Sequence, residues 1–310
     1  MIVIPLLKKI AELFLILFTT TALVKGRILK VSDSAVLSRL SLNFITPCVI
    51  FNSFQKELSP EVTRGLLVSA GLAVAFHILF FGFAWVLKKV WKASEVERAS
   101  VVFTNAGNLV IPLVSYVIGE EWVIYTSAYV VVFNILFWTV GIRMFDHESK
   151  PDYRKILLNP NLLAVAAGLF SLFIGLKLPE PVALAFSDVA VMIGPLSMMI
   201  TGIIVGSLSF SDLVSYRRVI GVVLFRMAVG SGLAVLLAVF SLKTGILSVD
   251  RSIVLIPLFA AIAPSASNIN QVAILYNKDA KYASVINVLT TLSCIATMPL
   301  WVMVFEALAG

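Results

Sequence analysis

Apolar residues recur along the whole 310-residue chain in blocks of about 18 to 24, and the length of these blocks constrains the fold. A helix rises about 1.5 Å per residue, so one block can cross a hydrocarbon core of roughly 30 Å. The chain is 60% hydrophobic and 13% charged, with a mean hydropathy of +1.01. Ordinary soluble domains are only about half apolar and a quarter charged. We therefore expect an all-α membrane protein.

Ten such blocks fit on the sequence, which predicts about ten transmembrane helices. They cover approximately residues 10–24, 38–54, 65–87, 99–118, 122–142, 157–176, 188–208, 219–242, 252–275 and 283–305. Cys48 and Cys294 both fall inside apolar blocks, so neither a disulfide framework nor a metal cluster is suggested. No cofactor and no metal site are expected.

The distribution of basic residues explains the formal net charge of +7. If the loops alternate between two sides, 16 of the 24 Lys and Arg residues lie on one side, seven on the other, and Arg226 within a helix. The positive-inside rule puts the richer side in the cytoplasm. We expect an integral, multi-pass protein of the cell (inner) membrane with both termini outside the cytoplasm, attracted to lipid headgroups and not to nucleic acid.

Prolines recur at similar intervals in the two halves of the chain. The pairs are Pro5 with Pro160, Pro47 with Pro195, and Pro112 with Pro264, in predicted helices 1 and 6, 2 and 7, and 4 and 9. Five helices per half is an odd number, so a repeat must be inverted across the membrane. The pattern predicts two inverted five-helix halves, 1–156 and 157–310. Because proline is common in transmembrane helices, coincidence is the alternative.

Predicted helices 4 and 9 carry polar stretches at their centres. Residues 104–108 read Thr-Asn-Ala-Gly-Asn, and residues 263–271 read Ala-Pro-Ser-Ala-Ser-Asn-Ile-Asn-Gln. Proline removes a backbone donor, and in hydrocarbon the freed carbonyls must find protein groups or trapped water. A half-helix that starts after such a break presents free N–H groups and a positive dipole end, which suits a carboxylate.

These two stretches supply the predicted substrate site. The candidate contacts are Asn105, Gly107, Asn108, Asn268 and Asn270, with Gly107 permitting close approach. The alternative is that these residues only hydrogen-bond neighbouring helices, as polar residues commonly do in membrane bundles. A sodium site made from carbonyls with Thr104, Ser267 and Gln271 is also open, although no carboxylate stands at the centre of a predicted span.

The polar stretch of helix 4 resembles a signature of the auxin efflux carrier (PIN-like) family: an Asn, a Pro seven residues later and a Gly-acidic turn. It reads Asn105-Ala106-Gly107-Asn108-Leu109-Val110-Ile111-Pro112-Leu113, followed by Gly119-Glu120-Glu121. Three further segments are similar to that family: Phe44-Ile45-Thr46-Pro47, Leu158-Asn159-Pro160-Asn161, and Ala263-Pro264 with Asn268. The similar segments are spread over most of the chain, and the long central loop of plant members is absent from it.

The resemblance implies a fold and a function. Members of this family are similar to bile-acid symporters, with ten helices in two inverted halves and with helices 4 and 9 broken and crossing. By resemblance, Asn105 contacts a substrate carboxylate, and Pro112 and Pro264 fall at or beside the crossover. Helices 1, 2, 6 and 7 would form a static, dimerising scaffold, and helices 3–5 and 8–10 would move. Plant members export auxin and bacterial members are associated with dicarboxylates, so we expect a secondary transporter of a small organic anion working by elevator-type alternating access.

Ionisable and small residues inside the predicted helices add further candidates. His77 could couple proton movement to transport, or could simply bond a carbonyl of the next helix. Arg226, eight residues beyond Arg218, could snorkel to the cytoplasmic face or act as a fixed cation that attracts anions into an inner vestibule. Gly202 and Gly206 form a surface for close helix packing, either within the monomer or at a homodimer seam, which the resemblance favours.

Other classes of function fit the sequence less well than a carrier does. An intramembrane enzyme needs a nucleophile or a metal set at membrane depth, but the sequence has only two histidines and no HExxH, GxSxG or P-loop motif. We expect no enzyme. A channel or a sensor built on a transporter fold is the alternative, because a fold does not fix a function.

Overall fold

The computed structural model describes residues 3–146, 148, 153–209, 216–245 and 249–309. These residues are 83% helical and form no strand. Six stretches are long and apolar enough to cross a membrane: Asp33–Ser53, Pro60–Val90, Glu120–Phe145, Glu180–Ser207, Val219–Lys243 and Ala280–Ala309. The predicted all-α membrane protein is confirmed.

Helices with few interruptions form most of the bundle. They are α1 (Val3–Lys25), α2 (Asp33–Leu40) continuing through the turn η1 (Ser41–Ile45) into α3 (Thr46–Ser53), α4 (Pro60–Val90), α9 (Tyr153–Leu157), α10 (Pro160–Ile174), α11 (Glu180–Val191) continuing into α12 (Ile193–Ser207), and α18 (Ala280–Ala309). The segment expected from residue 188 already begins at Glu180. Apolarity marks only the part embedded in lipid, whereas the helix begins at its own signal, a proline in the first turn.

The remaining helices carry wide π-helical turns or real breaks. They are α5 (Glu95–Val102), η2 (Ala106–Val110) with α6 (Ile111–Val117), the 3₁₀ turn η3 (Glu120–Trp122), α7 (Val123–Leu136) with η4 (Phe137–Gly141) and α8 (Ile142–Phe145), α14 (Val219–Leu224) with η5 (Phe225–Gly230) and α15 (Ser231–Lys243), α16 (Arg251–Ile262), and α17 (Asn268–Leu275). The predicted interruptions in helices 4 and 9 thus lie between α5 and η2 and between α16 and α17.

Pro47 and Pro112 each follow a π-helical turn and do not end their helices. The turn η1 precedes Pro47, and η2 precedes Pro112. A proline donates no N–H, and its ring crowds the carbonyl four residues earlier. A π turn widens the helix at that point, which relieves the crowding and lets the chain continue as a helix.

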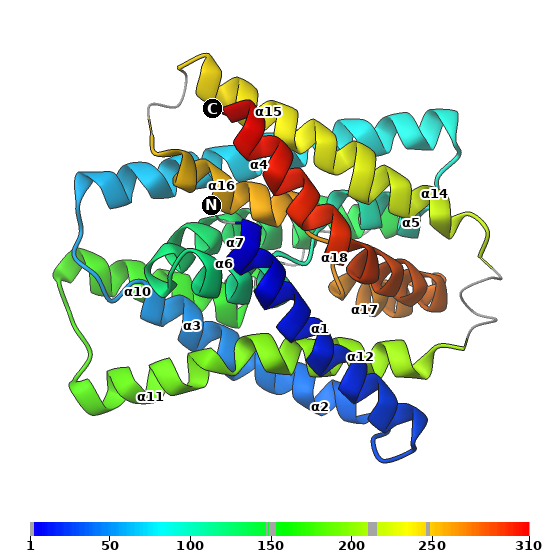
Figure 1. Ribbon diagram of the computed structural model, residues 1–310, viewed down its shortest axis with the longest axis horizontal. Helices are drawn as coiled ribbons and strands as arrows, with labels where there is room; N and C mark the ends of the chain where they lie inside the picture. Colours follow the sequence, from blue (N-terminus) through cyan, green and yellow to red (C-terminus); the bar gives the residue numbers. More distant parts are fainter. Residues whose placement is uncertain (1–2, 147, 149–152, 210–215, 246–248, 310) are drawn as a thin grey trace.

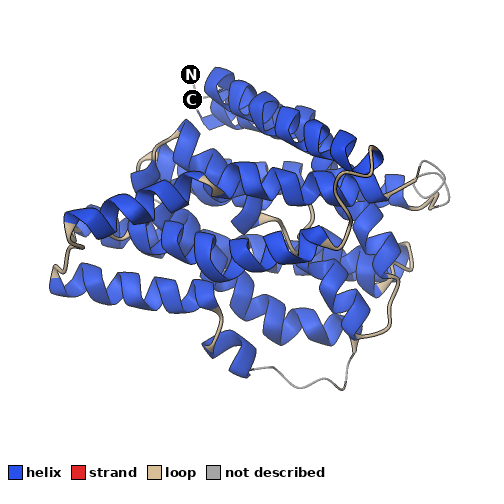
Figure 2. Cartoon of the chain, turned by 90° about the horizontal axis from the view of Figure 1, so that it is seen from below, coloured by secondary structure: helices blue, strands red, loops and turns tan. Residues whose placement is uncertain are grey.

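The helices pack in two groups. Figure 1 shows α1, α2, α3, α10, α11 and α12 in its lower half, and α4, α14, α15 and α16 in its upper half. α1 packs along α12, and α3 packs on α10 and α11, whereas α4 contacts α7 and α16, and α15 contacts α18. Seen from below, most helices run in similar directions, with loops gathered at the two ends (Figure 2). This arrangement places the two broken segments between the groups.

Gly202 and Gly206 of α12 let α1 approach closely. A Cβ atom at position 202 would lie 2.5 Å from the carbonyl oxygen of Leu17, and one at position 206 would lie 2.7 Å from the Cβ of Val24. The hydroxyl of Thr21 also donates to the carbonyl oxygen of Gly202 over 3.1 Å. Of the two interpretations from the sequence, packing within the monomer accounts for these glycines, because α1 covers this face of α12. A homodimer stays a prediction.

Candidate functional site

The two breaks lie side by side and pair as a short antiparallel bridge. The N–H of Asn105 donates to the carbonyl oxygen of Pro264 over 2.8 Å, and the N–H of Ala266 donates to that of Phe103 over 3.0 Å. A broken helix in lipid leaves backbone groups without partners, and water is not available to them. Each break therefore supplies hydrogen-bond partners for some of the free backbone groups of the other.

Helix α18 forms hydrogen bonds with the second break, which lies between α16 and α17. The side-chain amide of Asn287 donates to the carbonyl oxygen of Ser265 over 2.7 Å, and the N–H of Ser265 donates to the hydroxyl of Thr290 over 3.2 Å. Neither Asn287 nor Thr290 is predicted from the sequence as a site residue. Their signal is weak, because polar residues are scattered along this helix and do not form a continuous polar stretch beside a proline.

A cavity of about 40 Å³ lies beside the paired breaks. It is lined by Leu42, Thr46, Thr104, Asn105, Gly107, Asn108, Val130, Phe133, Asn134, Asn161, Ala266, Ser267 and Asn268. Four of the five predicted substrate contacts are thus brought together. The volume holds only a few water molecules and is far below the roughly 300 Å³ of a small ligand pocket, so the cavity must widen to admit a substrate.

Asn105 is the most enclosed of the predicted contacts, with 9% of its surface exposed. Its side-chain amide makes no hydrogen bond to another residue that the structure describes. The turn η2 begins directly after it, and α17 begins at Asn268, and neither start is capped by a side chain. Two positive helix ends and a free amide donor therefore adjoin one cavity.

The lining of the cavity does not include Asn270, Gln271, Pro112 or Pro264. Asn270 and Gln271 follow the start of α17, where the helix turns them away, and Gln271 is exposed. The sodium set that pairs Thr104 and Ser267 with Gln271 is therefore not assembled in this conformation. Pro264 lies in the paired break itself, whereas Pro112 lies inside α6 and faces Gly194 of α12.

Two asparagines of the cavity, Asn134 and Asn161, come from helices in which no site was predicted. Asn134 of α7 accepts a hydrogen bond over 3.1 Å from the side-chain amide of Asn159. Asn159 also caps α10, because its side-chain oxygen accepts from the N–H of Asn161 over 2.9 Å. From the sequence, the segment from Asn159 to Asn161 indicates only a resemblance to the family's sixth helix.

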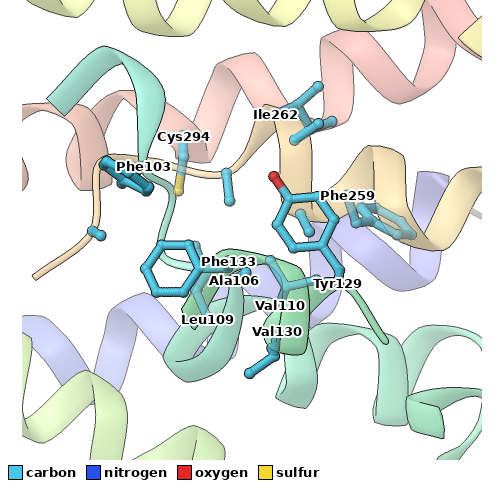
Figure 3. Packing of buried hydrophobic residues seen from close by; sticks show 14 of the residues in the cluster. Phe103, Ala106, Leu109, Val110, Tyr129, Val130, Phe133, Phe259, Ile262 and Cys294 are labelled. Atoms are coloured by element: carbon cyan, nitrogen blue, oxygen red, sulfur yellow. The ribbon is translucent and has the colours of Figure 1, made fainter. Parts of the chain in front are cut away.

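His77 lies within an aromatic cluster and not in the cavity. Its Nδ1 bonds the carbonyl oxygen of Ala73, one turn earlier on its own helix, over 2.7 Å. Its ring is 5.3 Å from that of Tyr129 and 6.1 Å from that of Phe103, centroid to centroid. Figure 3 shows Phe103, Tyr129 and Phe133 packed about the first break. The carbonyl that binds His77 thus belongs to α4 and not to a neighbouring helix.

Arg226 is fully buried behind the paired breaks. Its guanidinium donates to backbone carbonyl oxygens, among them that of Ala263 at 2.7 Å. It therefore does not snorkel to a membrane face, and it does not line the cavity. Backbone carbonyl oxygens surround the charge in place of water.

Two larger hollows lie toward opposite ends of the bundle. The larger hollow, of about 540 Å³, is lined by Lys92, Ser94, Glu95, Val96, Glu97, Tyr216, Arg217, Arg218, Lys278, Asp279 and Tyr282. The second hollow, of about 410 Å³, is lined by Val49, Asn52, Ser53, Gln55, Lys56, Ser115, Glu120, Glu121, Val123, Ala183 and Ala190. Burial lowers the pKa of Lys56 in the second hollow, although nearby Glu121 opposes that change.

A protein-family model described as a membrane transport protein matches residues 5–302. A search of curated proteins gave no match to the chain. The family match covers nearly the whole sequence, and it indicates a membrane transporter, since the family is one of transporters and not of enzymes. The chain therefore belongs to the membrane transport protein family, which is the family of auxin efflux carriers that its sequence resembles.

Proposed function

We propose that the protein is a secondary transporter of a small organic anion, either an auxin-like monocarboxylate or a dicarboxylate. One observation carries this proposal: Asn105, Gly107, Asn108 and Asn268, from two distant parts of the chain, line a single cavity between two helix starts. Their chemistry suits a carboxylate, and they lie together although they are distant in the sequence.

The cavity offers hydrogen-bond donors to a carboxylate, and its lining contains no charged side chain. The uncapped starts of η2 and α17 each contribute free N–H groups and a positive dipole end, worth about 0.3–1 kcal/mol for a nearby anion. The amides of Asn105, Asn108 and Asn268 add neutral donors. Neutral donors favour moderate affinity, which suits a carrier that must release its substrate on the other side.

We further propose that the chain forms ten transmembrane segments in two inverted halves, 1–156 and 157–310. The static scaffold would comprise α1, α2–α3, α10 and α11–α12, and the moving unit would comprise the remaining helices. The grouping of these helices in Figure 1 supports this division, as does the packing of α1 on α12. The cavity is lined by both groups, so a movement between them would open it.

Alternating access would connect the cavity to each of the two larger hollows in turn. The second hollow is lined by α3 and α11 on one side and by α6 and α7 on the other. It therefore lies along the boundary at which the moving unit would slide. The larger hollow lies at the opposite end, near the basic loops assigned to the cytoplasm.

The test is transport by the purified protein in liposomes. Charge movement on a supported membrane would be recorded against a panel of small carboxylates, with Asn105→Ala run beside the wild type, and exchange of labelled carboxylate would detect electroneutral transport. A saturable, carboxylate-specific signal that the variant loses is the expected result. Flux that does not saturate and shows no counterflow would indicate a channel, and binding without flux would indicate a sensor.

A further inference from the structure

Arg226 binds the carboxyl ends of both broken helices. It lies in the π-helical turn η5 with no exposed surface. Its Nε and Nη2 donate to the carbonyl oxygen of Ala263 over 3.1 and 2.7 Å, and Nη2 also donates to that of Ala261. Its Nη1 donates to the carbonyl oxygen of Val101 over 3.4 Å. The guanidinium also lies over the ring of Phe80, 4.8 Å from its centroid.

These carbonyls are the ones that the breaks leave without helical partners. α5 ends at Val102 and α16 ends at Ile262, and the last carbonyls of a helix have no N–H to bind. They also carry the negative end of the helix dipole. In many carriers, carbonyls at such half-helix ends bind a coupling cation such as Na⁺. Here a guanidinium, with five donors in a planar fork, already binds them.

We propose that Arg226 is the permanent cation of the paired breaks, so that carboxylate binding in the adjoining cavity requires no metal cation. The inference rests on the proposed function. Arg226 would act as a positioning residue, because it does not line the cavity and would not touch the substrate.

The electrostatic consequence follows from the direction of the half-helices. Arg226 neutralises the negative ends of α5 and α16, and the positive starts of η2 and α17 remain at the cavity. The paired breaks therefore present a net positive potential to an anion without a bound metal cation. Without the guanidinium, two negative helix ends would lie close behind the cavity, and a small cation would be needed to offset them.

The first experiment measures the dependence of carboxylate affinity on cations in the wild type. Binding to the purified protein and exchange in liposomes would be compared in sodium, potassium and choline salts at one ionic strength. The expected affinities are equal in all three. A wild type that requires sodium for binding would overturn the inference while leaving an anion carrier in place. If the wild type neither binds nor exchanges a carboxylate in any salt, the proposed function fails, and this inference fails with it.

The second experiment removes the guanidinium. Arg226→Met keeps much of the side-chain volume and is expected to lower carboxylate affinity at least about tenfold in choline. Sodium is expected to restore part of that affinity, a response that a merely structural role would not give. Arg226→Lys keeps the positive charge but loses the planar set of five donors. The carboxylate affinity of this variant should therefore lie between those of the wild type and Arg226→Met, and it should be independent of sodium. Arg64→Met, at an exposed position of α4, is the matched control.

Wild-type affinity of Arg226→Met in choline, where no sodium is present, would overturn the inference. An equal loss in all salts would also overturn it, because the residue would then serve folding alone. If Arg226→Met does not fold, Arg226→Lys decides: a sodium-dependent affinity in that variant contradicts a role for the charge.

Discussion

The side-chain amide of Asn159 donates to the side-chain oxygen of Asn134 over 3.1 Å. Asn159 caps α10, and Asn134 lies in α7 beside the cavity, so this bond joins a helix of the proposed scaffold to a helix of the proposed moving unit. Any sliding of one group against the other must break it. The pair is therefore a marker for the conformation described here.

A cross-link at this pair is expected to stop transport. The cysteine pair Asn134→Cys and Asn159→Cys, in a chain whose buried Cys48 and Cys294 are replaced by alanine, should be bridged by mercury ions. Counterflow should cease and should recover when a thiol removes the mercury. Each single-cysteine variant serves as the control. Undiminished counterflow in the fully bridged protein would contradict a movement between α7 and α10.

Replacement of Asn105 by alanine is expected to weaken carboxylate binding about 10- to 100-fold, because one donor to a charged group is worth about 1.5–3 kcal/mol. Asn105→Asp should weaken it further, since a second negative charge would lie at the cavity. Asn43→Ala is the matched control: that amide is exposed and bonds the carbonyl oxygen of Arg39. Equal binding constants for the wild type and Asn105→Ala would remove Asn105 from the site.

A methyl group on Gly202 is expected to destabilise the protein. The added Cβ would lie 2.5 Å from the carbonyl oxygen of Leu17, so α1 and α12 must move apart, which costs about 1–3 kcal/mol. Gly82→Ala, in α4, has open space around the added methyl and should be neutral or stabilising. Thermal unfolding in detergent compares the two. The prediction is wrong if both variants melt at the same temperature.

The loss of Arg218 is expected to destabilise the end of the bundle near the larger hollow. Glu97 is 3% exposed, and its carboxylate accepts hydrogen bonds from the Nε of Arg218 over 3.0 Å and from the hydroxyl of Tyr282 over 2.9 Å. Arg218→Met would leave a buried carboxylate without its cation, at a cost of about 3 kcal/mol or less, because Arg218 itself is half exposed. Arg217→Met, at the exposed neighbouring position, should melt like the wild type.

Asp250 should make the unfolding temperature depend on pH in the acidic range. Its carboxylate caps α16 by accepting from the N–H of Ser252 over 2.7 Å, and hydrogen bonding to Ser252 lowers its pKa below the usual 3.8. A lowered pKa in the folded state stabilises the fold above the usual pKa, and this contribution is lost as pH falls below 3.8. Asp250→Asn keeps the cap and should lose this part of the acid dependence, whereas Asp250→Ala should cost about 1 kcal/mol at neutral pH.

The sequence predicted the features that local composition encodes. Apolar length predicted the helices, and the polar residues around Asn105 and Asn268 predicted the breaks, because such stretches are unusual inside an apolar block. Asn134 and Asn161 were missed because a single asparagine in a helix does not show which way it faces. The place of Arg226 could not be predicted, since its partners are backbone carbonyls, which every residue possesses.

The small volume of the cavity bears on the energy balance of a cell. The cavity of about 40 Å³ has no lining residue in common with the larger hollow or with the second hollow. In the conformation described for these residues, no continuous passage joins the two hollows through the cavity, which holds only a few water molecules. A membrane that carries this protein at rest would then lose little of its ion gradients through it, and the cost of each transport cycle would be set by the cargo and not by leakage.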